Sequence, residues 1–300
     1  MAVHPFVPAD IEAALDRRYI VGPEIAVGGQ GVVFGATRAL RPDGTAAHDV
    51  VALKLHLYRS QDIRVEREIS AIEDISHPNL ARLIEHGYCD VAGRRTRYVA
   101  WEFIEGQPLS HRLRSERLLE SEVLPIGRDV SAAIAAIWSR RIVHGDIKPS
   151  NIMLRDSGGA VLIDLGVARY LEQGNTPAAR RPLGTLGYLS PEQIGAEKGL
   201  SCASDIFSLG VVMLQSLLGR HPTDYDQSAL ADGIRASGGR LGVSTGLLCT
   251  LDKMLSVRPA FRPIPAGLSG RFQRLQQRME EEFAMGSRAP QESSGLVSGI

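Results

Sequence analysis

The chain has 300 residues, of which 44% are hydrophobic, so it can bury a sizeable core and form more than one lobe. Lys and Arg together number 34, as do Asp and Glu, and the zero formal net charge gives no general attraction for nucleic acid or an anionic membrane. The three cysteines are widely spaced and form no CxxC pair, which argues against a disulfide framework or a cysteine-bound zinc.

The chain shows no targeting or membrane-spanning pattern. Residues 1–10 lack the basic start and apolar stretch of a signal peptide. The longest apolar stretch, residues 206–214, is too short to cross a bilayer and is expected to form a buried helix. We therefore expect a cytoplasmic protein that does not contact the membrane.

Strand patterns dominate the first hundred residues. Residues 1–18 are expected to be an N-terminal leader, partly helical over 11–17. Strands are then predicted over residues 19–39, with a turn at Gly28-Gly29, and over 50–57 and 98–104. The spacing of isoleucines predicts a helix over 63–75.

Helical periodicity dominates after Pro108. It predicts helices over residues 109–113, 122–139, 204–219, 247–255 and 267–283. Residues 284–300 are rich in Gly and Ser and are expected to be a disordered tail. A mainly strand part followed by a mainly helical part predicts an α+β protein with a small sheet lobe and a larger helical lobe.

The most informative segment is His144–Asn151, together with Asp164 after the next apolar stretch. It brings Asp146, Lys148 and Asn151 into one tight loop. Phosphoryl transfer from ATP requires such a set: a carboxylate that orients the attacking hydroxyl, an ammonium that neutralises the phosphate, and oxygen ligands for Mg²⁺. The spacing therefore predicts a phosphotransferase site.

Two further segments could contact phosphate groups. Residues 26–33 form a glycine-rich strand–turn–strand whose backbone N–H groups could approach phosphate oxygens, although an ordinary hairpin would look the same. Lys54 lies on a strand that is apolar on both sides of it, so its ammonium needs partners. Glu68 and Glu66 on the predicted helix are the candidates, and Glu68 is preferred because its distance to residues 77–79 resembles the spacing in protein kinases.

The segment 184–192 is expected to be structural. The segment resembles the end of a protein kinase activation segment, and this resemblance implies that Glu192 pairs with Arg262. Such a pair can be bidentate and would tie two distant loops together. Asp205 resembles the kinase residue that anchors the catalytic loop from the helix beneath it. It could also cap that helix, and the two roles are compatible.

In order and spacing, these motifs resemble the protein kinase superfamily over roughly residues 19–280, and most of all bacterial Hanks-type serine/threonine protein kinases. The resemblance implies a bilobal fold. A five-stranded antiparallel sheet with one main helix would form the N-lobe over residues 19–104, and a mainly helical C-lobe would cover 105–283.

The resemblance also implies the roles of individual residues. Asp146 would be the catalytic base and Lys148 would stabilise the transition state, while Asn151 and Asp164 would hold Mg²⁺, or Mn²⁺ in its place. The residues implied in ATP binding are Ala26, Gly28, Gly31, Val33, Ala52, Lys54, Glu68, Glu102, Ile104 and Met153. Trp101 would stand just before the hinge and close the pocket behind the adenine.

Departures from the family pattern leave two alternatives open. Gly145 replaces an arginine that often receives an activation-loop phosphate, so we expect activity without strict dependence on phosphorylation of Thr176 or Thr185. Ala26 replaces a glycine of the phosphate loop, which raises the alternative of a pseudokinase that regulates a protein partner. A small-molecule kinase is the second alternative. The favoured substrate is a protein Ser or Thr, including residues of the chain itself, and oligomeric state is left open.

Overall fold

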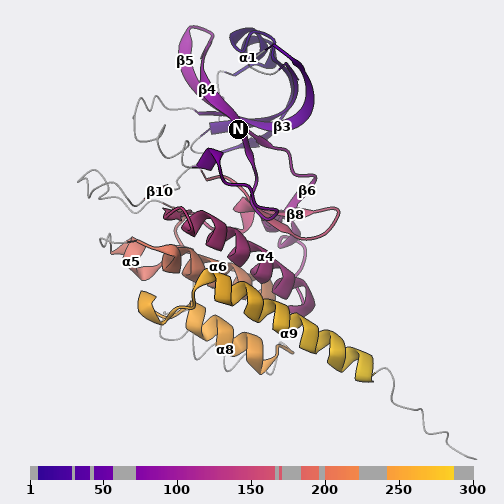
Figure 1. The fold of residues 1–300 in the computed structure, drawn as a ribbon, viewed down its shortest axis with the longest axis vertical. Helices are drawn as coiled ribbons and strands as arrows, with labels where there is room; N and C mark the ends of the chain where they lie inside the picture. Colours follow the sequence, from indigo (N-terminus) through magenta and orange to yellow (C-terminus); the bar gives the residue numbers. More distant parts are fainter. Residues whose placement is uncertain are drawn as a thin grey trace, which may run out of the picture.

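The computed structural model describes residues 6–28, 31–40, 44–56, 72–165, 169–170, 184–195, 200–222 and 242–286. A sheet forms the upper part of the molecule and a group of helices forms the lower part (Figure 1). This arrangement confirms the predicted α+β class. Within these ranges, no helix combines the length and the apolar character that crossing a membrane would need.

Five antiparallel strands form the upper sheet in the order β1-β2-β3-β5-β4. They are β1 Tyr19–Val27, β2 Gly31–Leu40, β3 Ala46–His56, β4 Leu83–Val91 and β5 Arg94–Glu102. The sequence patterns did not predict β4 or the first half of β5, which carry many polar residues. Their hairpin turn has positive φ at both Ala92 and Gly93, a geometry that matches the twist of paired strands.

The segment predicted as a leader packs on the sheet. Helix α1, Pro8–Ala14, contacts β1 and β4, and Phe6, Ile11 and Leu15 are buried beside it. Glu12 accepts a hydrogen bond from the backbone N–H of Val21 at 2.7 Å, at the point where the β1–β2 register shifts. These residues therefore cover the face of the sheet opposite to Lys54.

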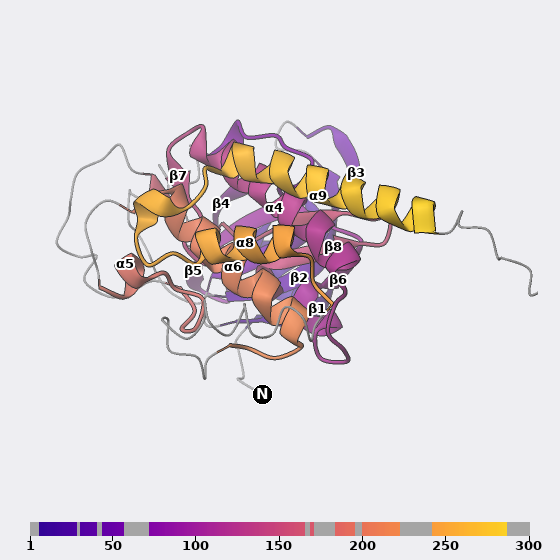
Figure 2. The same cartoon turned by 90° about the horizontal axis from the view of Figure 1, so that it is seen from below.

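Helices form the lower part, and all except the short helix over residues 191–194, which was not predicted, lie close to their predicted positions. They are α3 Leu109–Arg112, α4 Glu120–Trp138, α5 Pro191–Ile194, α6 Cys202–Leu218, α8 Thr245–Met254 and α9 Pro265–Gly286. Helix α9 lies along α4 in both views and extends past the body of the molecule (Figure 1, Figure 2).

Several short elements accompany the main sheet and the helices. Strands β6 Gly106–Pro108, β8 Ile152–Arg155 and β9 Ala160–Leu162 form a small sheet, and β7 Ile142–Val143 pairs with β10 Arg169–Tyr170. The 3-10 turns η1 Pro149–Asn151 and η3 Pro259–Phe261 complete the described elements.

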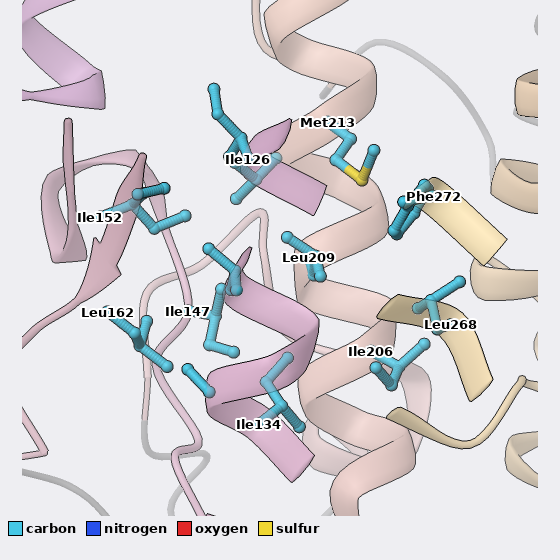
Figure 3. Close-up of a cluster of buried hydrophobic side chains, with 14 of the residues drawn as sticks. Ile126, Ile134, Ile147, Ile152, Leu162, Ile206, Leu209, Met213, Leu268 and Phe272 are labelled. Atoms are coloured by element: carbon cyan, nitrogen blue, oxygen red, sulfur yellow. The ribbon is translucent and has the colours of Figure 1, made fainter. Parts of the chain in front are cut away.

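The lower core explains the apolar run over 206–214. Helix α6 is buried along almost its whole length, and Ile206, Leu209 and Met213 meet side chains of α4 and α9 (Figure 3). Ile147 joins the same cluster and is fully buried. Because Ile147 stands between Asp146 and Lys148, its burial fixes the loop that carries both polar side chains.

Two predictions fall partly or wholly outside the described residues. Of the helix predicted over 63–75, only residues 72–75 are described, and Ile72 and Ile75 are buried there. Of the predicted tail over 284–300, residues 284–286 belong to α9, and residues 287–300 lie outside the described ranges.

Candidate active site

Asp146 is at the centre of a compact polar group. Its Oδ2 lies 2.7 Å from Lys148 Nζ, and its Oδ1 accepts hydrogen bonds from the N–H and the Oγ1 of Thr185, both at 2.8 Å. Lys148 Nζ also donates to Thr185 Oγ1 at 2.6 Å. The threonine hydroxyl therefore links the acid and the lysine, and it fixes the direction in which the carboxylate points.

Asn151 closes the same loop from its other end. Its Nδ2 donates to the backbone carbonyl of Asp146 at 2.9 Å and lies 3.3 Å from Asp146 Oδ2. These bonds orient the amide so that its Oδ1 remains as the atom able to bind a cation. The 3-10 turn η1, which begins with Pro149, holds the asparagine in this place.

Asp205 anchors the loop from beneath. Its two carboxylate oxygens accept the backbone N–H groups of His144 and Gly145, each at 2.9 Å. Burial raises the pKa of Asp205, against the effect of the two N–H donors. The anchor prediction is confirmed. The additional capping role is wrong, because Ser201 caps α6 by accepting a bond from Ala203.

Asp164 follows β9 and has a left-handed backbone conformation with φ 60°. Its Oδ1 lies 2.6 Å from Lys54 Nζ, across the boundary between the upper sheet and the lower part. The loop that carries Asp146 is joined to the loop that carries Asp164, because His144 Nε2 lies 3.1 Å from the carbonyl oxygen of Ile163. The structure thus brings Asp146, Asn151 and Asp164 to one place, together with Lys54.

Lys54 points into the region between the two parts of the molecule. It lies opposite Val33 on β2 and Val99 on β5 in the sheet register. Because strand side chains alternate, Ala52 shares the face of Lys54. His56 shares it too, and burial, followed by the charges of Lys54 and Arg97, lowers the pKa of His56 to about 4.

The residues predicted to surround an adenine ring come from both parts. Ala52 pairs with Trp101 and lies one strand from Val33. Met153 packs against the small apolar cluster that contains Ile104, at the start of the lower part. The side chain of Glu102 faces Arg155 at 3.6 Å and Arg82 N at 3.3 Å. These apolar residues are the ones that could form a slot for an adenine ring, with backbone groups of residues 102 and 104 along its edge.

The glycine-rich turn is described only in part. Ala26 pairs with Val33, and the N–H of Gly28 donates to the carbonyl of Gly31 at 2.9 Å. A Cβ on Gly31 would lie 2.3 Å from the carbonyl oxygen of Leu55, so only glycine fits there. Gly29, Glu68 and Thr176 lie outside the described residues, so the predicted pair of Lys54 and Glu68 stays a prediction.

Glu192 and Arg262 form the predicted bidentate pair. The Nη1–Oε1 distance is 2.6 Å and the Nη2–Oε2 distance is 2.9 Å. Ser204 also donates to Glu192 at 2.7 Å, and the guanidinium lies 4.9 Å from the ring centre of Phe207. Burial alone would raise the pKa of Glu192, but the hydrogen bonds from Arg262 and Ser204 lower it.

The sequence analysis missed Gln193, which is buried next to the catalytic loop. Its Nε2 donates to the carbonyl of Gly145 at 3.1 Å, and its Oε1 accepts from Ser190. The signal was available, since Ser followed three residues later by Gln is a capping-box pattern. That pattern accounts for the contact with Ser190 but does not predict the one with Gly145.

The group of polar side chains fits a magnesium–nucleotide complex. Asp164 offers a carboxylate and Asn151 an amide oxygen, the hard ligands that Mg²⁺ prefers, and Lys54 offers an ammonium beside them. The described residues contain no cluster of three or more His, Cys, Asp and Glu that could hold a metal alone.

Comparison with known proteins identifies the family of the chain. A model of the protein kinase domain matches residues 19–245. The chain is 28% identical to the probable serine/threonine-protein kinase PknB of Lactococcus lactis over 73% of its length and 34% of the relative's. It is 30% identical to the serine/threonine-protein kinase PknA of Nostoc sp. over 84% of its length and 46% of the relative's. A plant relative, the L-type lectin-domain containing receptor kinase V.7 of Arabidopsis thaliana, is 35% identical over 51% of the chain and 24% of its own length. The chain thus spans less than half of these relatives, and by its domain match and its fold it belongs to the protein kinase family.

Proposed function

We propose that this chain transfers the γ-phosphate of ATP, bound with Mg²⁺ or Mn²⁺, to Ser or Thr hydroxyls of proteins, including its own. The observation that carries the proposal is the contact of Asp146 with both Lys148 and Thr185. The carboxylate is only 10% exposed, so it is held in one direction in partly desolvated surroundings. Such preorganised charge is what phosphoryl transfer requires.

In this proposal Asp146 orients the substrate hydroxyl and accepts its proton as the bond to phosphorus forms. Lys148 lies beside the carboxylate and stabilises the charge that develops on the moving phosphoryl group. Thr185 keeps both groups in place through its hydroxyl. When bound, ATP would supply the phosphoryl group and leave as ADP, and its metal ion would neutralise part of the phosphate charge.

The other predicted residues bind the nucleotide. Asn151 and Asp164 hold the metal, and Lys54 holds the α- and β-phosphates with Glu68 as its partner. The remaining contacts come from the glycine-rich turn and the apolar slot, through Ala26, Gly28, Gly31, Val33, Ala52, Glu102, Ile104 and Met153. The boundary between an N-lobe over 19–104 and a C-lobe over 105–283 falls at this slot.

The proposed substrate is a protein, because Gly184–Glu192 builds an ordered segment beside Asp146 on which a peptide can lie. A lysine two residues after the proposed catalytic aspartate, as Lys148 is after Asp146, resembles the motif of serine/threonine kinases and not that of tyrosine kinases. A regulatory protein partner and a cytoplasmic location, where ATP is available, are part of the same proposal.

The test is incubation of the purified chain with γ-labelled ATP, a generic protein substrate, and either Mg²⁺ or Mn²⁺. We expect label on Ser and Thr that is absent with Asp164→Ala. Label on a small metabolite alone would favour a small-molecule kinase. A thermal shift with ATP but no label on any substrate would favour a pseudokinase.

A further inference from the structure

The peptide group between Gly145 and Asp146 is hydrogen-bonded on both of its sides. The carbonyl of Gly145 accepts a bond from Gln193 Nε2 at 3.1 Å. The N–H of Asp146 faces His144 Nδ1 at 3.3 Å. The N–H of Gly145 is held by Asp205 Oδ1 at 2.9 Å. Any rotation of this peptide group would redirect the carboxylate of Asp146, so its partners bear directly on the proposed chemistry.

Gln193 is itself fixed at its other end. Its Oε1 accepts bonds from both the N–H and the Oγ of Ser190, each at 3.0 Å. The residue is 5% exposed and lies on the short helix α5. A flipped amide would place its NH₂ group against the N–H of Ser190 and its oxygen against the carbonyl of Gly145, so the network determines which atom faces Gly145. The buried side chain thus has one orientation, with its donor on the catalytic loop.

The surroundings of Gly145 leave little freedom for another arrangement. Gly145 has φ 77°, a left-handed conformation that glycine adopts readily, and it has no side chain with which to anchor the loop. A Cβ on Gly184 would lie 2.7 Å from the carbonyl oxygen of Gly145, so the chain of the 184–192 segment passes close by. Gln193 supplies a side-chain donor at this crowded point.

We propose that Gln193 is a positioning residue for phosphoryl transfer. Through the carbonyl of Gly145 it holds the backbone of Asp146, and it couples the Ser190–Ile194 segment to the catalytic loop. The inference rests on the proposed kinase function and adds to it a residue that acts through Asp146 without contacting the nucleotide or the substrate.

Gln193→Glu removes the hydrogen bond that Gln193 donates to Gly145 while keeping the bonds that it accepts from Ser190. A carboxylate of the same length still accepts the two bonds from Ser190 but cannot donate to Gly145, and it places charge against a carbonyl oxygen. A buried acceptor that loses its donor is costly, so we expect kcat to fall about tenfold. The KM values for ATP and for peptide should change less than about twofold, because no substrate contact is lost.

The pH profile separates positioning from a general structural role. Burial raises the pKa of a carboxyl group, and the protonated form regains an O–H donor toward Gly145. The ratio of variant to wild-type kcat should therefore rise as the pH falls from about 8 to about 6. Gln277→Glu on the exposed surface of α9 is the matched control, and its ratio should stay flat and near one.

Gln193→Met is the second variant, in case the carboxylate prevents folding. It keeps the length of the side chain and removes both polar atoms, so kcat should fall with no recovery at low pH. Wild-type kcat in a folded Gln193→Met protein, or a flat ratio with normal kcat in Gln193→Glu, would overturn the inference. A wild-type chain without activity would instead contradict the proposed function.

Discussion

Lys54 and Asp164 form a direct ion pair between the upper sheet and the lower part, with 2.6 Å between Nζ and Oδ1. They are 110 residues apart in the sequence, and the lysine side chain is 8% exposed. The pair joins strand β3 of the upper sheet to the loop that follows β9. The proposed phosphate-binding cation, Lys54, and the proposed metal ligand, Asp164, are thus in direct contact with each other.

Lys54→Met should abolish phosphoryl transfer, with kcat/KM for ATP falling at least about a hundredfold. The change removes the ammonium proposed to hold the phosphates and leaves Asp164 without this cation. Steady-state kinetics with labelled ATP measures the effect. Lys253→Met on the exposed side of α8 is the control, and equal losses in both variants would contradict the assignment.

Asp146→Asn should lower kcat by about a hundredfold to a thousandfold, because an amide cannot accept the proton of the substrate hydroxyl. ATP affinity, measured by calorimetry, should stay within about threefold of the wild type. Asp146 contacts Lys148 and Thr185, and Asn151 is the one residue proposed for nucleotide or metal binding for which a hydrogen bond to Asp146 is described. Asp156→Asn, in an exposed turn, should leave both quantities unchanged. A fully active Asp146→Asn protein would refute the proposed base.

Thr185→Val should lower kcat about tenfold and Thr185→Ser should restore most of it. The hydroxyl joins Lys148 Nζ at 2.6 Å to Asp146 Oδ1 at 2.8 Å, and valine keeps the shape of threonine while removing that link. The measurement is kcat for the phosphorylation of a peptide substrate at a serine residue. Equal rates for the valine and serine variants would show that the hydroxyl does not matter.

Arg262→Ala should destabilise the fold by about 3–5 kcal/mol, because it leaves the buried carboxylate of Glu192 without its cation. Folding lowers the pKa of Glu192 from its ordinary value of 4.5. Its ionised form therefore stabilises the fold fully above that value, and the contribution is lost as the pH falls below it. Urea unfolding at neutral and acidic pH measures both effects, and Glu192→Gln should lack the acid-dependent part.

Trp101→Ala should open the space behind the adenine slot. The side chain is half-buried, stands opposite Ala52 in the strand register, and packs against the core of the lower part. Use of ATP analogues with bulky substituents on the adenine should improve about tenfold, while KM for ATP stays within about threefold. Trp138→Ala, which removes a similar contact to the same core from α4, should lose stability without this gain.

The helical lobe and the catalytic motif could be predicted with little error. The apolar periodicity of residues 204–219 and 122–139 appears as α6 and α4 within a few positions, because burial of one face or of a whole helix leaves a regular pattern. The strand β4 could not be predicted. Its polar side chains obscure the alternation, and it is a strand because β5 supplies its hydrogen bonds.

The sequence by itself determined which residues are proposed for the chemistry, since Asp146, Lys148, Asn151 and Asp164 are recognisable from spacing within a short stretch of chain. Only the tertiary structure decided which distant groups they meet. The contact of Lys54 with Asp164 and that of Gln193 with Gly145 join residues 110 and 48 positions apart. Local patterns carry information about nearest neighbours along the chain, whereas these bonds depend on how the sheet, α5 and the catalytic loop pack in space.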